Sequence, residues 1–240
     1  MNIARKIASQ IKRFPFGKSF GYKDLNITKD QYVTAAKALE RLQKKGVIKK
    51  VANGKFYKPE ETIFGELRPS EYELLKPYLF EGNKRIAYIT GASLYNGMGL
   101  TTQVAARIKI ASRGRRIYVQ AGNIKATPAK SYVEVTNDNY IQLGFLDALK
   151  DINRVSDLNP KSGVIILSNI LKEMSDKTLK ETIKYAMAYP PRARALLGAL
   201  LENMGKNESI GKLKDSLNPF SEYKVVISKE LPTAKNWNLI

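Results

Sequence analysis

The chain has 240 residues, 43% of them hydrophobic and 26% charged, which suits a globular protein of one large domain or two small ones. It contains no cysteine and no histidine, so disulfides, catalytic thiolates, Ser-His-Asp triads and zinc sites built from those ligands are excluded. The 41 basic residues exceed the 22 acidic ones by a net charge of +19, which favours nucleic acid or another acidic surface as the partner.

The basic charge is concentrated near the N-terminus, where residues 1–60 hold 15 basic and 4 acidic side chains. This concentration favours a functional role for the charge over a role in solubility alone. The first predicted element is a helix over residues 2–13, with three isoleucines at helical spacing and a stop at the following Phe-Pro-Phe-Gly. A brief strand and one helical turn are expected over residues 19–27.

The next predicted element is a helix over residues 29–45. Thr28 and Gln31 have the spacing of a capping box, and Gly46 after two lysines is typical of a helix C-terminus. One side of the helix carries an apolar stripe: Tyr32, Ala35, Ala36, Leu39 and Leu42. The other side carries polar, basic or small residues: Gln31, Thr34, Lys37, Ala38, Arg41 and Lys45. Such a face fits a helix in the major groove of DNA, with Lys37 or Arg41 reading guanine.

A hairpin is predicted after this helix, with strands over residues 47–51 and 55–58 around an Asn-Gly turn that needs positive φ at both positions. Its lysines, Lys49, Lys50 and Lys55, would contact phosphates. Helices and a basic hairpin within 60 residues predict a winged helix-turn-helix. Such a module can also serve protein contacts, but the basic face favours DNA.

The rest of the chain is predicted to be a second, mixed domain over residues 61–240, which makes the fold class α+β. Residues 60–69 resemble a linker, and a short helix should follow Ser70. The segment 86–136 is expected to be rich in strands, over residues 86–90, 104–110, 116–121 and 132–135. The segment 141–216 is expected to be helical, with helices over residues 141–152, 176–189 and 192–204, before a last strand over 223–228.

The stretch TGASLYNGMGLTTQ, residues 90–103, resembles a phosphate-binding loop but lacks the spacing and the lysine of one. We expect a tight turn between strands in which Thr101 and Thr102 satisfy backbone groups, or else a surface site for RNA or a partner protein. Two arginines at a later turn, Arg115 and Arg116, could contact a second phosphate backbone or be simply solvated.

Arg192 and Arg194 stand near a predicted helix N-terminus, where cations are disfavoured. An acidic partner would explain them, as would local pairing with Glu202 or Asp176. The carboxylates show no paired spacing typical of acid–base chemistry, so we expect no catalytic site, no metal and no cofactor. No apolar run approaches the roughly 18 residues of a membrane span, and the N-terminus has no signal peptide, so we expect a cytoplasmic protein.

Four segments together resemble the AbiEi-type antitoxins of bacterial type IV, abortive-infection, toxin–antitoxin systems. The segments are ALERLQKKGVIKKVANGKFYKP, TGASLYNGMGLTTQV, YPPRARALLGALLENMG and YKVVISKELPTAKNW. The resemblance implies a repressor whose winged helix binds double-stranded DNA at repeats in its own promoter. It also implies that the C-terminal part neutralises a nucleotidyltransferase-like toxin, with or without a stable complex. The candidates for contacting that toxin or a second nucleic acid are two threonines and four arginines: Thr101, Thr102, Arg115, Arg116, Arg192 and Arg194.

Two alternatives remain open on the residues alone. One is a winged-helix transcription regulator, or a plasmid replication or partition protein, without a toxin partner. The other is an enzyme acting on RNA or on the toxin, which would need a carboxylate–metal centre because histidine and cysteine are absent.

Overall fold

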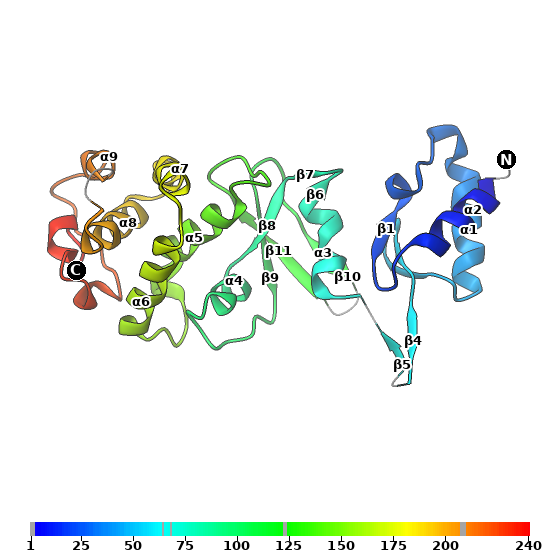
Figure 1. The fold of residues 1–240 in the computed structure, drawn as a ribbon, viewed down its shortest axis with the longest axis horizontal. Helices are drawn as coiled ribbons and strands as arrows, with labels where there is room; N and C mark the ends of the chain where they lie inside the picture. The colour runs from blue at the N-terminus through cyan, green and yellow to red at the C-terminus, as the bar shows by residue number, and fades with distance from the viewer. Residues whose placement is uncertain (1–2, 64, 68, 122–123, 207–209) are drawn as a thin grey trace. The chain divides into compact units, whose positions relative to one another are not determined.

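The computed structural model describes residues 3–63, 65–67, 69–121, 124–206 and 210–240 (Figure 1). Helices and strands alternate irregularly along the chain, which confirms the predicted α+β class. The chain divides into two compact units, residues 1–83 with 118–125 and residues 84–117 with 126–240. The division thus differs from the predicted boundary after residue 60. None of the described helices has the length and apolar character needed to cross a membrane.

The first unit is built on two helices and a three-stranded antiparallel sheet of order β1-β3-β2. The helices α1 and α2 pack side by side (Figure 1). The core between helices and sheet holds Ile7, Ile11, Leu39, Ile48 and Phe56. The elements are α1 Ile3–Arg13, β1 Ser19–Gly21, η1 Tyr22–Leu25, η2 Lys29–Gln31, α2 Tyr32–Lys44, β2 Lys49–Ala52 and β3 Lys55–Tyr57. These bounds confirm the predicted order, although Asn2, the predicted start of the first helix, lies outside the described residues.

The predicted helix 29–45 begins as a 3-10 turn and differs in two details. The side chain of Thr28 makes no capping hydrogen bond, because the Gln31 N–H donates to the Thr28 carbonyl oxygen at 3.1 Å instead. Tyr32 is exposed and contacts Tyr22, whereas Ala38 is buried in the core. The buried side of the helix is therefore rotated toward Ala38. Gly46, with φ of +73°, ends the helix as predicted.

The hairpin β2–β3 also departs from its prediction. Gly54 has a φ of +68°, but Asn53 does not adopt a positive φ. The pairing register shifts between Lys50 and Ala52, so β2 carries an irregularity close to the turn.

The predicted linker 60–69 is wrong, because its described residues form a second hairpin, β4 (Glu60–Thr62) with β5 (Gly65–Leu67). The helix α3 (Glu71–Leu79) follows and begins at Ser70, whose side chain accepts the Glu73 N–H as predicted. The Ser19 hydroxyl donates to the Glu73 carbonyl oxygen at 2.5 Å. This contact ties α3 to β1 and explains why the first unit extends beyond residue 60. Its remaining strands are β6 Phe80–Glu81 and β10 Val119–Ala121.

The second unit contains three strands in the order β11-β9-β8. Their bounds are β8 Ala87–Thr90, β9 Ile108–Ser112 and β11 Ile124–Lys130, and β7 Lys84–Arg85 precedes them. The strand β11 runs parallel to β9, and β8 runs antiparallel to it. The first predicted strand is confirmed, the second begins later than residue 104, and residues 132–135 form no strand. The prediction missed β11 because Pro128 interrupts its apolar pattern.

Helices make up most of the second unit: α4 Ala92–Gly97, α5 Tyr140–Asp151, η3 Ile152–Arg154, α6 Pro160–Lys172, α7 Asp176–Ala186, α8 Pro191–Asn203, α9 Gly211–Asp215, η5 Ser228–Glu230 and η6 Ala234–Trp237. The predicted turn in TGASLYNGMGLTTQ is wrong, because α4 occupies it. The helices α5 and α8 are buried over most of their surface and form the centre of this unit. The α8 helix matches the predicted range 192–204 to within one residue at each end, since it runs from Pro191 to Asn203.

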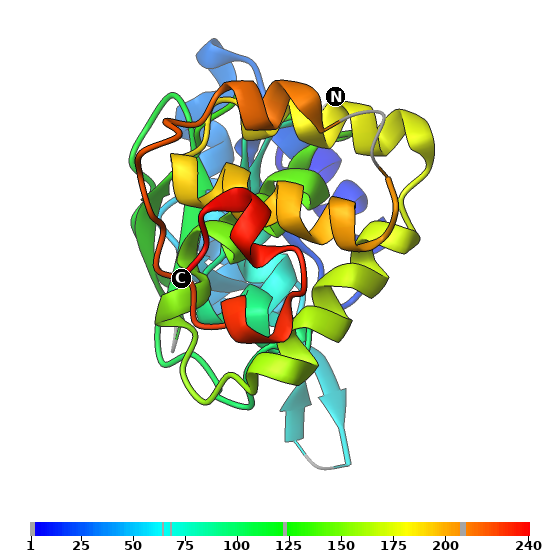
Figure 2. The same cartoon turned by 90° about the vertical axis from the view of Figure 1, so that its left-hand side faces the viewer.

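The C-terminal residues pack on α8 and do not return to the sheet (Figure 2, red). The predicted strand 223–228 is wrong, since its described pairing is an isolated bridge between Tyr223 and Leu239. Trp237 is 1% exposed, and its indole N–H donates to the Glu202 carboxylate at 2.5 Å. The C-terminal segment is thus anchored by an aromatic side chain.

Candidate nucleic-acid interface and basic pocket

The outward side of α2 forms the candidate interface of the first unit. Thr34, Lys37, Arg41 and Lys45 are exposed, and Gln31 is half-buried. They are held outward because Ala35 and Leu39 fix the other side of the helix in the core. The helix carries one acidic residue, Glu40, which pairs with Lys44 at 2.8 Å. The face therefore presents hydrogen-bond donors and positive charge to solvent.

The three lysines of the β2–β3 hairpin are not equivalent. Lys50 is exposed, whereas Lys49 forms an ion pair with Glu66 of β5. Lys55 is half-buried, and burial lowers its pKa, an effect that Asp24 opposes. Of the three predicted phosphate contacts in this hairpin, Lys50 is thus the one that is exposed and, among the described residues, has no competing carboxylate.

The hydroxyl of Thr101 satisfies a backbone group, as predicted, because it accepts the Gln103 N–H at 3.1 Å. A carboxylate that the sequence did not suggest also holds both Thr101 and Thr102. Asp157 accepts the Thr101 hydroxyl at 2.5 Å, the Thr102 backbone N–H at 3.1 Å and also the Thr102 hydroxyl. These hydrogen bonds lower the pKa of Asp157. The two hydroxyls are therefore engaged in fixing the loop after α4 to the segment before α6.

The four arginines proposed as a second contact surface lie in different surroundings. Arg115 and Arg116 are exposed at the turn after β9. Arg194 donates through Nη1 to the Ser216 carbonyl oxygen at 3.1 Å. Its expected pairing with Glu202 or Asp176 is wrong, because Glu202 accepts from Trp237 and Asp176 pairs with Lys206. Arg192 instead lines a pocket.

This basic pocket, about 410 Å³ in volume, lies within the second unit. Its basic side chains come from β9, α5, the turn η3 and α8: Lys109, Lys150, Arg154 and Arg192. Its apolar wall consists of Pro128, Ala129, Tyr132 and Pro190, and Thr90 and Asp151 complete the lining. The sequence offered no local signal for this set, apart from Arg192.

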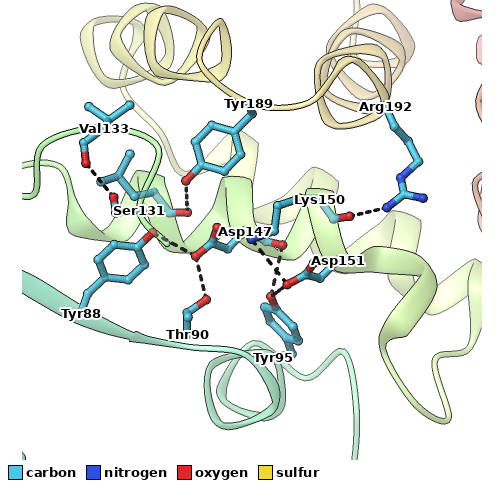
Figure 3. Close-up of polar contacts among 11 residues, drawn as sticks. Tyr88, Thr90, Tyr95, Ser131, Val133, Asp147, Lys150, Asp151, Tyr189 and Arg192 are labelled. Carbon is cyan, nitrogen blue, oxygen red and sulfur yellow. Dashed lines mark hydrogen bonds and ion pairs between the residues drawn. The ribbon is translucent and has the colours of Figure 1, made fainter. Parts of the chain in front are cut away.

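A buried polar network lies beside the pocket (Figure 3). Asp147 is fully buried and accepts hydrogen bonds from the Tyr88 hydroxyl at 2.9 Å and the Thr90 hydroxyl at 2.8 Å. Lys150 lies 2.9 Å from Asp147 and 3.6 Å from Asp151. Burial raises the pKa of Asp147, and the Lys150 ammonium opposes that rise. Burial alone would lower the pKa of Lys150, but the two carboxylates raise it.

The network fixes the pocket's charged groups in position. Arg192 donates through Nη2 to the Lys150 carbonyl oxygen at 2.8 Å, as Figure 3 shows. The Tyr95 hydroxyl donates to Asp151 at 2.9 Å. The spacing of the carboxylates along the chain did not predict this network. A local signal for it exists in Asp147, a lone aspartate within the otherwise apolar run LGFLDAL, because a buried charge needs partners.

Within the described ranges, no group of three or more acidic side chains has an arrangement that could hold a metal ion.

Comparison with known proteins gives a family and a fold. Residues 6–179 match a family described as a family of unknown function, DUF6088. No curated protein matches the chain. A similar solved structure is that of the RV2827C protein from Mycobacterium tuberculosis, with a TM-score of 0.50 and 13% identity, over 92% of this chain and 84% of that chain. At this identity the similarity concerns the fold alone.

Proposed function

The chain belongs to the DUF6088 family, and we propose that it is a DNA-binding repressor and the antitoxin of a bacterial type IV toxin–antitoxin system. The DNA-binding half is carried by one observation, the exposed basic side of α2. Thr34, Lys37 and Arg41 point away from a core that buries the opposite side of the same helix.

The order of two helices followed by the β2–β3 hairpin in the first unit supports a winged helix-turn-helix, in which α2 would be the recognition helix and β2–β3 the wing. In this arrangement Arg41 or Lys37 donates to guanine, and Lys50 contacts phosphate. Gln31, Thr34 and Lys45 extend the same surface. One such helix reads only a few base pairs, so two copies on adjacent repeats are needed for useful specificity.

The antitoxin half of the proposal rests on the resemblance of four segments to AbiEi-type antitoxins. Its partner is a nucleotidyltransferase-like toxin, which the second unit neutralises in the cytoplasm. The alternative is a winged-helix regulator, or a plasmid replication or partition protein, without a toxin. The exposed α2 surface is compatible with an antitoxin and with a regulator that has no toxin partner, so neutralisation of a toxin must be tested directly.

The DNA-binding half is tested by fluorescence anisotropy with a labelled duplex of the gene's own upstream region, an unrelated duplex and a salt series. We expect Arg41→Ala to weaken binding by about 1–3 kcal/mol on the cognate duplex only. Lys50→Ala should weaken binding to both duplexes and reduce the salt slope by about one. Lys177→Ala, which removes an exposed charge from the second unit, is the matched control. If the wild-type protein binds both duplexes with equal affinity, the proposed role as a sequence-specific repressor is refuted.

The antitoxin half is tested by co-expression with a neighbouring gene of nucleotidyltransferase type. We expect the chain to restore growth that the toxin arrests. The Arg41→Ala variant should still restore growth but should no longer repress its promoter. The reason is that the substitution lies in α2, the proposed DNA-binding helix, whereas toxin neutralisation is assigned to the second unit. If the wild-type chain does not restore growth, the alternative of a winged-helix regulator that has no toxin partner is favoured.

A further inference from the structure

We propose that the basic pocket of the second unit binds a mononucleotide, with its phosphate on Lys109, Arg154 and Arg192 and its base against Tyr132. The proposal does not depend on the proposed function, because DNA binding is assigned to residues of the first unit.

The first argument is the charge of the pocket. Lys150 is neutralised by Asp147 and Asp151, so it contributes little free charge. Among the residues that the structure describes, no carboxylate forms an ion pair with Lys109, Arg154 or Arg192. Three cations that line one pocket repel one another unless an anion lies between them. Their arrangement therefore favours a ligand with concentrated negative charge, as a phosphate group has.

The second argument is the position of Arg192. This side chain is half-buried near the start of α8, where the helix dipole disfavours a cation. It is nevertheless held there by its hydrogen bond to the Lys150 carbonyl oxygen. A bound anion would interact favourably with both the guanidinium and the positive end of the helix dipole. The guanidinium is thus pre-organised for an anionic ligand.

The third argument concerns Lys109 and the glycine of the preceding loop. Gly91 has a φ of +74°, and a Cβ atom there would lie 2.9 Å from the Lys109 Cδ atom. A larger residue would thus be strained and would also displace the lysine stem. Glycine at this position leaves the Lys109 side chain room to lie across the end of β8, beside Thr90 of the pocket.

The fourth argument is the size and the apolar wall. The volume of about 410 Å³ lies within the range of small-molecule sites, and exceeds what a bare phosphate ion would fill. Tyr132 is half-buried and held by contact with Tyr189, with ring centroids 4.6 Å apart. Pro128 and Pro190 complete this wall. A fixed aromatic ring beside a group of cations suits a base attached to a phosphate.

The test is isothermal titration calorimetry of the full chain with AMP, adenosine and inorganic phosphate, each up to about 1 mM. We expect AMP to bind saturably and more tightly than either of its parts. The double variant Lys109→Gln/Arg154→Gln should weaken AMP binding at least about tenfold, because it removes two charged contacts to the phosphate. Both side chains are exposed, so the substitutions should leave the fold intact and change only the affinity for AMP. The control Lys161→Gln/Lys177→Gln removes the same charge from exposed sites outside the pocket and should leave AMP affinity unchanged.

Several results would overturn the assignment. They are the absence of AMP binding, an equal loss in the control variant, or adenosine or inorganic phosphate binding as tightly as AMP. Binding of a 5′-phosphorylated oligonucleotide without binding of AMP would replace the mononucleotide by a nucleic-acid chain. The pocket variants should retain wild-type binding to the promoter duplex, so failure of this proposal is distinguishable from failure of the DNA-binding proposal.

Discussion

Replacing Gly198 by alanine should destabilise the second unit through Trp237. A Cβ atom at Gly198 would lie 2.2 Å from two carbon atoms of the indole ring, much closer than contact distance. Overpacking of this kind costs about 1–3 kcal/mol. Displacing the ring would also weaken its hydrogen bond to Glu202, worth about 1.5–3 kcal/mol for a charged acceptor. The higher helix propensity of alanine offsets about 1 kcal/mol, so we expect a net loss of about 2–3 kcal/mol.

The assay is urea unfolding followed by tryptophan fluorescence, which reports on this site because Trp237 is the one tryptophan of the chain. Emission of the folded variant should shift to longer wavelength as the ring moves toward solvent. Gly97→Ala is the matched control, because a Cβ atom at Gly97 meets nothing within 4 Å, and it should be neutral or slightly stabilising. In a Trp237→Leu background, followed by circular dichroism, Gly198→Ala should cost much less. Unchanged stability and emission of Gly198→Ala would refute the reasoning.

Asp147→Asn should lower the free energy of unfolding by about 2–3 kcal/mol, because it removes a buried charge that accepts from Tyr88, Thr90 and Lys150. A urea unfolding curve that shows no loss of stability would contradict this. The lowered pKa of Asp157 means that its stabilisation is present above the unfolded value of about 3.9 and is lost as the pH falls through the folded pKa. The stability difference between wild type and Asp157→Asn should therefore shrink below about pH 4, and a pH-independent difference would count against this linkage. If the β2–β3 hairpin contacts phosphate as proposed, Lys50→Ala should weaken DNA binding more than Lys49→Ala, because the Lys49 side chain is already in an ion pair with Glu66. Anisotropy that shows the reverse order would contradict the proposed role of Lys50.

Local pattern was enough to predict the first unit's order of elements. Helical spacing of isoleucines, a glycine at position 46 and the Asn-Gly turn are signals within a few residues of one another, and each marked a real element. Signals of the same kind bound α8, where Pro191 stands at the first helical position and Gly205, with a φ of +73°, lies just past the helix end. Predictions were wrong where the outcome depends on which groups a side chain contacts. At Thr28, for example, the side chain makes no capping hydrogen bond, and the Gln31 N–H donates to the Thr28 carbonyl oxygen instead.

The strands of the second unit show the same limit. The short, proline-containing segment of β11 has a weak strand pattern of its own and is a strand because β9 pairs with it. Residues 223–228 are apolar enough for a strand but lie against the chain terminus. Because strand formation depends on a partner that is distant in sequence, propensity alone could not decide either case.

Composition and helical periodicity are enough to show that the chain is basic, that it contains no histidine or cysteine, and that a basic helix face lies near its N-terminus. The folded chain adds two facts: Arg192 joins Lys109 and Arg154 around one pocket, and Lys49 is paired while Lys50 is exposed. Charge and helical periodicity are properties of neighbouring residues. A pocket or an ion pair between elements forms only when the fold brings distant residues together, as it brings Arg192 to Lys150 across 42 positions.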